Sequence, residues 1–339
     1  MQKSELLKDV VRHVDATAFD ARPIIQAYGD MAFQARNLAS AADIANRMLR
    51  DRDCGVILTL AGSLCSAGLK DAIALMIDND MVDAVVSTGA NIVDQDFFEA
   101  LGFKHYQGDI HADDQVLREL AIDRIYDTYI DEDELRVCDM TIADIANSLD
   151  PRAYSSREFI KAMGKYLDDG NLKAEHSIVH SAYRKGVPIF CPAFSDCSAG
   201  FGLVHHQWNR EKYLTIDSVA DFRELTQIKL KIGETGILML GGGVPKNFTQ
   251  DVVVATDILG EETPMHKYAI QFTVADERDG ALSGSTLREA CSWGKVDVAL
   301  EQMVYAEATT VAPVIVSDVF HRGAWKTRPR HRYGDMFND

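Results

Sequence analysis

The segment Cys291-Ser292-Trp293-Gly294-Lys295 places a lysine two residues after a tryptophan. A lysine at an ordinary protein surface keeps its proton up to a pKa of about 10.4. Partial burial against the indole of Trp293 would disfavour the charged form and leave a nucleophilic amine, which is the group that Schiff-base chemistry requires. The alternative is structural: Lys295 begins a strand and extends its ammonium to solvent, while Trp293 fills core.

A second candidate is the glycine-rich segment 241–246, Gly-Gly-Gly-Val-Pro-Lys, which lies between an apolar run and a helix-like run that begins at Asn247. Glycines at such a turn let the backbone approach a pyrophosphate, and the N-terminus of the following helix supplies N–H donors. The segment matches neither the G-x-G-x-x-G fingerprint nor a Walker A loop. The alternative is a tight turn that needs a positive φ.

Two acidic residues have two readings each. Asp196 could accept hydrogen bonds from a pair of ribose hydroxyls, or it could form an Asx turn or an N-cap. Glu289 could hold a substrate ammonium near Lys295. However, the segment from Thr286 to Glu289 also matches a capping box, in which Glu289 satisfies a helix N-terminus.

The remaining metal-binding residue types form no recognisable site. His176 and His180 have helical spacing but no acidic third ligand at a suitable distance along the chain, and the adjacent His205 and His206 point in different directions on a regular element. The 6 cysteines include no C-x-x-C pair. We therefore expect no metal and no disulfide framework, and a reducing compartment.

Composition narrows the class of protein further. The net charge of −17 argues against nucleic acid as a partner and suits cationic ligands such as amines. An apolar content of 47% is ordinary for a soluble protein, and no apolar run approaches the roughly 20 residues that span a bilayer. The first 14 residues do not resemble a secretory signal. We expect a cytoplasmic protein without a membrane partner.

Short apolar runs predict the elements that position these residues. We expect strands at 55–60, 82–87, 187–190, 236–240, 252–254 and 269–273, with 311–316 as a strand or a helix. Continuous hydrophobicity in the strands, with helices between them, predicts an α/β fold with a Rossmann-like, doubly wound, mostly parallel sheet and helical excursions. We expect a helical lead-in at 1–50, one catalytic domain at 51–325 and a polar tail at 326–339. The charged stretch 109–185 is predicted to be mostly helical.

Ligands of such sheets bind beyond the carboxyl ends of the strands. Small, hydroxyl-bearing or acidic residues follow five of the predicted strands, at 61–63, 87–91, 192–196, 241–243 and 273–276. These residue types are also common in ordinary loops. Their recurrence at five strand ends favours a binding site along this edge.

Taken together, these motifs resemble the deoxyhypusine synthase family. The segment 292–295, Ser-Trp-Gly-Lys, is similar to the lysine motif of the family, and 241–246 to its glycine-rich segment. The segments 67–71 and 81–88 are similar to the first strand–helix–strand region, and 33–36 to an N-terminal helix. The resemblance extends from about Phe19 to Phe320.

The resemblance implies NAD-dependent transfer of an aminoalkyl group. NAD accepts hydride from a polyamine such as spermidine, the motif lysine captures the aminobutyl group as an imine, an acceptor amine displaces it, and NADH reduces the product. By this resemblance Lys295 is the nucleophile, Trp293 packs on the donor and Glu289 binds an amine end. The positions that would hold NAD are Ser63, Thr88, Gly89, Asp196, Gly242, Gly243, Ala275, Asp279, Glu307 and Ala308. The family also implies a homotetramer with active sites at a dimer interface.

Three positions depart from the eukaryotic pattern. Asn247 replaces a histidine, and Phe201 and Leu282 replace two aspartates that grip polyamine nitrogens. Each charge-assisted hydrogen bond contributes about 1.5–3 kcal/mol, so we predict a changed amine specificity, with a diamine or guanidino-amine possible in place of a protein lysine acceptor.

The alternatives are a homospermidine-forming or other small-amine transferase, a sirtuin-like deacylase and a non-catalytic NAD-binding homologue. The lack of paired C-x-x-C motifs and the presence of Lys295 argue against the deacylase. The three departures motivate the non-catalytic reading.

Overall fold

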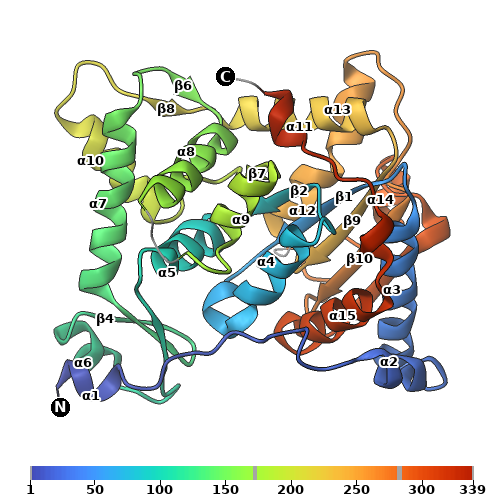
Figure 1. The fold of residues 1–339 in the computed structure, drawn as a ribbon, viewed down its shortest axis with the longest axis horizontal. Coiled ribbons are helices and arrows are strands. Elements are labelled where there is room, and N and C mark those ends of the chain that lie inside the picture. The colour runs from blue at the N-terminus through green and yellow to red at the C-terminus, as the bar shows by residue number, and fades with distance from the viewer. Residues whose placement is uncertain (1, 171–173, 281–284, 338–339) are drawn as a thin grey trace.

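The computed structural model describes residues 2–170, 174–280 and 285–337 of the chain (Figure 1). Leu282, one of the three departures, therefore lies outside the described residues, as does part of the loop before Thr286.

The centre of the molecule is a six-stranded sheet in which every pairing is parallel. In spatial order its strands are β11 (Glu301–Tyr305), β10 (Tyr268–Thr273), β9 (Thr235–Leu240), β1 (Gly55–Leu60), β2 (Ala84–Ser87) and β7 (Ile189–Phe190). The chain runs outward from β1 in one direction and from β9 in the other, so the strand order reverses between these two strands. This is a doubly wound α/β fold, which confirms the predicted class.

Helices cover both faces of the sheet. Residues alternate between the two faces along a strand, so Val56, Leu58 and Leu60 of β1 face one cluster and Ile57 faces another. The first face carries α3 (Phe33–Arg50), α4 (Lys70–Asp78), α9 (Ile178–Lys185) and α15 (Ala308–Arg322). The second face carries α11 (Ser218–Ile232), α12 (Gly243–Gln250), α13 (Val252–Ile258) and α14 (Leu287–Ser292).

Further elements extend from the β7 side of the sheet and from the N-terminus. They are α7 (Glu132–Ser148), α8 (Ser156–Asp169), α10 (Ser198–Trp208), the short helices α1 (Lys3–Leu6), α2 (Arg22–Gly29), α5 (Phe98–Ala100) and α6 (Asp114–Glu119), and the strand pair β6 (Ala153–Tyr154) and β8 (Thr215–Ile216). Helical turns of other types occur at Cys65–Leu69, Ala90–Phe97, Val298–Leu300, Ala324–Thr327 and Tyr333–Met336. Helices α7 and α10 pack together at the far side of the molecule from α14 (Figure 1).

A small antiparallel sheet lies at and just before the start of the stretch 109–185, which was predicted to be mostly helical and otherwise contains helices α6 to α9. Its strands are β3 (His105–Gln107), β5 (Thr128–Asp131) and β4 (Ile122–Ile125), in that order, and β4 and β5 form a hairpin. These strands are only three or four residues long. Such short runs offer too few alternations to register as a period, which is why the prediction missed them.

One predicted strand is a helix, and one observed strand was not predicted. The run 252–254 lies in helix α13, where Val252 packs against residues of α11. A short apolar run cannot be distinguished from a buried helical turn by periodicity alone. Strand β11 was missed because it is an edge strand with polar residues, and only Val304 in it is fully buried. The run 311–316 is helical and belongs to α15.

The C-terminal segment is anchored beneath the amino ends of β1 and β2. The Arg328 side chain is buried, pairs with the buried carboxylate of Asp83, and donates to the carbonyl oxygens of Asp80 at 2.8 Å and Cys54 at 2.9 Å. Asp83 also accepts a hydrogen bond from the backbone N–H of Val56 at 2.7 Å. The division of the chain at residues 50 and 325 stays a prediction.

Candidate functional site

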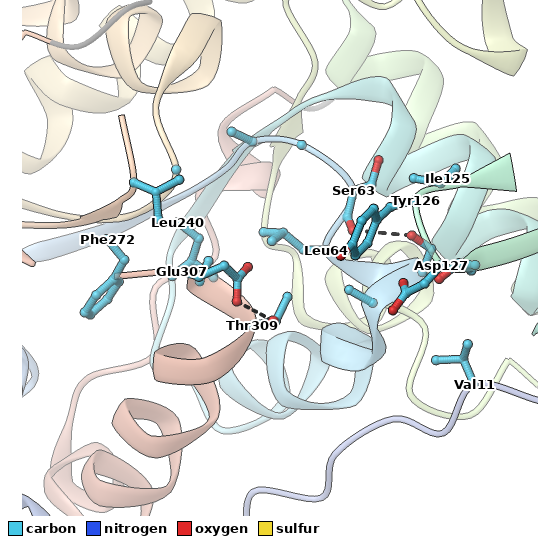
Figure 2. Close-up of a pocket in the computed structure, with 18 of the residues that line it drawn as sticks. Val11, Ser63, Leu64, Ile125, Tyr126, Asp127, Leu240, Phe272, Glu307 and Thr309 are labelled. Carbon is cyan, nitrogen blue, oxygen red and sulfur yellow. Dashed lines mark hydrogen bonds between the residues drawn. The ribbon is translucent and has the colours of Figure 1, made fainter. Parts of the chain in front are cut away.

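A cavity of about 860 Å³ opens at the carboxyl ends of β1, β9, β10 and β11 (Figure 2). The loops after these strands supply Ser63, Gly241, Val274 and Glu307, and the β4–β5 hairpin supplies the opposite wall. The cavity therefore lies beside the point where the strand order reverses, which is where doubly wound folds bind nucleotides.

The loop after β1 is held by a buried amide. The Asn91 side chain accepts hydrogen bonds from the backbone N–H groups of Leu64 at 2.7 Å and Cys65 at 3.3 Å, and donates to the carbonyl oxygen of Ala61 at 3.2 Å. The Thr88 hydroxyl donates to the Gly62 carbonyl at 3.0 Å. These bonds fix the loop that carries Ser63, so Thr88 supports the cavity from behind rather than lining it.

The glycine-rich turn adopts a backbone that other residues rarely take. Gly241 has a φ of 86°, and a Cβ atom there would lie 2.8 Å from the Cβ of Ala61. Gly243 has a φ of 65°, and Gly242 is the N-cap of α12 without a capping side chain. The turn therefore brings bare backbone to the rim of the cavity, although Gly242 and Gly243 do not line it.

Glu307 and Ala308 lie at the start of α15, on the wall formed by the end of β11. Glu307 caps the helix by accepting hydrogen bonds from the backbone N–H of Thr310 at 3.2 Å and from the hydroxyl of Thr309. Glu307 and Asp127 are the charged residues that line the cavity, and none of the described lining residues is lysine or arginine. The cavity suits hydroxyl groups better than an additional phosphate.

The other predicted cofactor residues lie around this edge and not in the cavity lining. Gly89 is buried, and a Cβ atom there would lie 2.4 Å from the sulfur of Cys197, so close packing explains this glycine. Asp196 is exposed in the loop after β7, and Asp279 is exposed beyond β10. Ala275 follows the lining residue Val274, and its N–H donates to the Thr273 hydroxyl oxygen at 3.0 Å.

Lys295 lies at the other end of the sheet. Its carbonyl oxygen accepts a hydrogen bond from the N–H of His266 at 2.9 Å, and His266 stands two residues before β10 begins. Its ammonium forms an ion pair of 2.5 Å with Asp251 and lies 5.2 Å from the centre of the Trp293 ring. Trp293 is 70% exposed and does not fill core, so that structural reading is wrong.

Glu289 occupies the capping position that the sequence offered as one of its two roles. Its carboxylate accepts from the N–H of Thr286 at 2.6 Å, and its own N–H donates to the Thr286 hydroxyl oxygen at 3.1 Å. These hydrogen bonds lower the pKa of Glu289. The side chain is exposed, so a capping role and a contact with a cation are compatible.

A second lysine lies beside the first. Lys246 is fully buried and donates a hydrogen bond to the carbonyl oxygen of Ser285. Burial lowers the pKa of Lys246 to about 8; Glu289 opposes this shift and the charge of Lys295 adds to it. Asn247 follows Lys246 on α12, and Asp251 ends that helix. The ion-pair partner of Lys295 therefore lies at the end of the helix that carries Lys246 and Asn247.

A buried chain of hydrogen bonds ties this region together. The Lys229 ammonium lies 2.8 Å from the Thr235 hydroxyl, which lies 2.7 Å from Nδ1 of His266, whose Nε2 lies 3.2 Å from the Thr249 carbonyl oxygen. An ammonium can only donate and a carbonyl can only accept, so the chain runs from Lys229 to Thr249 with His266 neutral. Burial holds the pKa of His266 well below its usual value.

Sequence reasoning missed two groups of residues at this edge. The hairpin residues 125–128 line the cavity but fell in the stretch predicted to be mostly helical. Asp94, near Asp196, is mostly buried and accepts the N–H of Ser198 at 2.7 Å; burial raises the pKa of Asp94 to about 6. The strands of the hairpin are too short to show a period, and no local signal marks Asp94.

Phe201 is 70% exposed on α10, beside exposed Val204 and Trp208. In the described part of the chain, no group of three or more histidine, cysteine or acidic residues could hold a metal ion. All six cysteines are free thiols. Among the described helices, none is long and apolar enough to cross a membrane.

Comparison with known proteins agrees with these features. The family model for deoxyhypusine synthase matches residues 23–319. The chain belongs to the deoxyhypusine synthase family. A deoxyhypusine synthase-like protein from Chlorobaculum parvum is 64% identical and covers 100% of this chain and 97% of its own length. One from Coxiella burnetii is 61% identical, with 99% and 96% covered.

More distant relatives carry the synthase name itself. "Probable deoxyhypusine synthase 2" from Methanosarcina mazei is 44% identical over 88% of this chain and 86% of its own length. A solved structure described as a candidate deoxyhypusine synthase from Entamoeba histolytica has a TM-score of 0.60, covers 95% of this chain and 99% of its own, and is 18% identical, so it shows the fold alone. Membership of the family supports a transferase of the aminobutyl-transferring type.

Proposed function

We propose that the protein is an NAD-dependent aminoalkyl transferase in which Lys295 carries the transferred group as an imine. The observation that carries this proposal is the environment of Lys295, whose ammonium lies between a carboxylate and an exposed indole face. An aromatic face and a carboxylate both bind cations. When a substrate amine arrives, its ammonium can replace that of Lys295 beside these two groups, and Lys295 can give up its proton.

The cavity at the carboxyl ends of the strands would hold NAD, which supplies a hydride acceptor. Ser63 and Ala308 line this cavity with small groups, and the backbone of the turn at Gly242 and Gly243 would approach the dinucleotide from the rim. The Glu307 carboxylate would accept hydrogen bonds from ribose hydroxyls. Thr88 and Gly89 would act by shaping the loop, and Asp196, Ala275 and Asp279 would contribute from the rim.

Oxidation of a primary or secondary amine gives an iminium carbon that a neutral amine can attack. Lys295 would lose its proton, form a bond from Nζ to that carbon, and expel the original amine nitrogen, which takes the proton. An acceptor amine would repeat the exchange and release Lys295, and the hydride held by NADH would then reduce the product imine, so that the net reaction is a transfer without oxidation. Trp293 would pack on the alkyl chain, Glu289 would bind a terminal ammonium, and Asn247 would contact the substrate from α12.

A second copy of the chain would complete the site. Lys295 lies before the amino end of β10, and the cavity lies beyond its carboxyl end; six residues of strand span about 20 Å. Hydride transfer and capture by Lys295 must occur within the length of one small amine. The distance within one chain therefore favours a site made by the lysine of one subunit and the cavity of another, in a dimer or tetramer.

We propose a polyamine or diamine as the donor and a free amine as the acceptor, in preference to a protein lysine. The exposed ring of Phe201 offers no charge where the family binds an amine nitrogen. This substitution favours a less highly charged substrate, as in a homospermidine-forming enzyme. The free thiols accord with the cytoplasmic location expected from the sequence.

The test is to incubate the protein with NAD and single amines, reduce with borohydride and locate adducts by mass. We expect an amine-dependent adduct on Lys295, absent in Lys295→Arg. Lys326→Arg, on the C-terminal segment, is the matched control and should keep the adduct. Failure to form any adduct with putrescine, spermidine, agmatine or homospermidine would refute the transferase.

A further inference from the structure

The hairpin between β4 and β5 ends in a two-residue turn, Tyr126 and Asp127, because Ile125 pairs with Thr128. Both turn residues line the cavity of about 860 Å³. Figure 2 shows the Tyr126 ring projecting from the hairpin toward Ser63 and Leu64, with Glu307 on the other side of the cavity. The hairpin tip therefore faces the strand-end loops across the space where a ligand would lie.

Tyr126 has an unusual backbone for its residue type. Its φ is 52°, in the left-handed region, where two-residue hairpin turns ordinarily carry glycine or asparagine. Its side chain is 70% exposed, so packing within the chain does not compensate for the strained backbone. Strained residues of this kind occur where a side chain serves a ligand.

The turn is held on both sides. Arg124 donates from Nη1 to the carbonyl oxygen of Tyr126 at 2.8 Å, and its other nitrogens bind the Asp114 carboxylate with two hydrogen bonds of 2.7 Å. On the other side, the N–H of Gly108, the residue after β3, donates to the carbonyl oxygen of Asp127 at 2.7 Å. The ring thus projects from a fixed backbone and loses little freedom when it packs on a planar ligand.

We propose that Tyr126 packs its ring against the adenine of the dinucleotide, so that the hairpin forms the second wall of the nucleotide site. This inference rests on the proposed function. Glu307 lies across the cavity from Tyr126, and its carboxylate would accept hydrogen bonds from ribose hydroxyls, as acidic residues at strand ends do for the adenosine of a dinucleotide. The adenine beside that ribose would then lie within reach of the Tyr126 ring.

Stacking of a base on an aromatic side chain is lost when the side chain is cut to alanine, and the loss corresponds to an affinity about 5- to 150-fold weaker. The test compares Tyr126→Ala and Tyr126→Phe with Tyr213→Ala, which removes a tyrosine that is 42% exposed outside the cavity. Calorimetry measures the Kd of each full-length variant for NAD, ADP-ribose and nicotinamide mononucleotide, and circular dichroism checks that each is folded.

We expect Tyr126→Ala to bind NAD and ADP-ribose about 5- to 150-fold more weakly, with the affinity for nicotinamide mononucleotide unchanged, and both other variants to bind as the wild type does. Equal affinities of Tyr126→Ala and the wild type for ADP-ribose would overturn the inference and leave the proposed function intact. Weaker binding of NAD without weaker binding of ADP-ribose would also overturn it, because the ring would then contact nicotinamide. A wild type that binds no NAD would overturn the proposed function itself.

Discussion

Replacement of His266 by leucine tests whether the buried chain from Lys229 to Thr249 positions Lys295. The substitution removes the acceptor of the Thr235 hydroxyl and the donor to the Thr249 carbonyl, and all three groups are fully buried. A buried polar group left without a partner costs about 1–3 kcal/mol, so the variant should lose about 2–6 kcal/mol of unfolding free energy. The backbone hydrogen bond between His266 and Lys295 remains, but the hydrogen bond that links the His266 side chain to Thr249 on α12 is lost.

The pH dependence gives a sharper test, because His266 is neutral in the fold. An unfolded histidine has a pKa near 6.5, so below that pH the unfolded state binds a proton that the native state does not. Stability from His266 is therefore present above about pH 6.5 and lost as the pH falls. Between pH 7.5 and 5.5 the wild type should lose about 1.4 kcal/mol relative to His266→Leu. The carboxylates titrate in both proteins and cancel in the difference.

Urea unfolding at both pH values measures this difference, and the rate of adduct formation on Lys295 measures positioning. Thr235→Val and the double variant Thr235→Val/His266→Leu complete a double-mutant cycle. Residues in one hydrogen-bonded network couple by about 0.5–3 kcal/mol, so we expect a coupling energy in that range. A stability difference that is the same at both pH values would show that His266 binds a proton as readily in the native state as in the unfolded state. Adduct formation at the wild-type rate in a folded His266→Leu would refute the positioning role.

Four further predictions follow from the same geometry. Arg328→Met leaves the buried Asp83 carboxylate unpaired and should lower the unfolding free energy measured in urea by about 3–5 kcal/mol. The Arg330 side chain is half exposed, so Arg330→Met should lower it by under about 1 kcal/mol. Equal losses would contradict the anchoring of the C-terminal segment. Burial raises the pKa of Asp221 to about 7, so the stability that its protonated form provides below about pH 4 is lost by pH 7. The unfolding free energy of Asp221→Asn relative to that of the wild type should therefore rise between pH 5 and pH 8. No relative rise in the urea midpoint at pH 8 would show that the carboxylate ionises freely. Random pairing of Lys295→Ala subunits with Ser63→Trp subunits should restore about one quarter of the wild-type transfer rate if sites are shared, and no activity in the mixture would place each site within one chain. Tyr126→Gly relieves the left-handed backbone and should raise the unfolding free energy by about 1 kcal/mol while weakening NAD binding; a lower melting temperature would show that the ring stabilises the fold.

The local pattern of the sequence was enough for the fold class and for most of the central strands. Runs such as 55–60 and 236–240 are continuously apolar because both faces of β1 and β9 are covered, and that condition leaves a signal within six residues. Strand β11 and the β4–β5 hairpin carry weaker signals, since the first is an edge strand and the second is very short. The capping box at Thr286 and Glu289 could also be recognised from the sequence, because its two residues are only three positions apart.

The sequence by itself determined the family and the chemical types at the site, since Lys295, Trp293 and the glycine-rich turn belong to motifs that are contiguous in the chain. Only the tertiary structure decided which of these groups meet. It paired Lys295 with Asp251, 44 positions away, brought the hairpin turn at Tyr126 against loops after four strands, and separated Lys295 from the cavity by the length of a strand. Such contacts depend on the direction and order of strands in the sheet, which no local pattern of residues encodes.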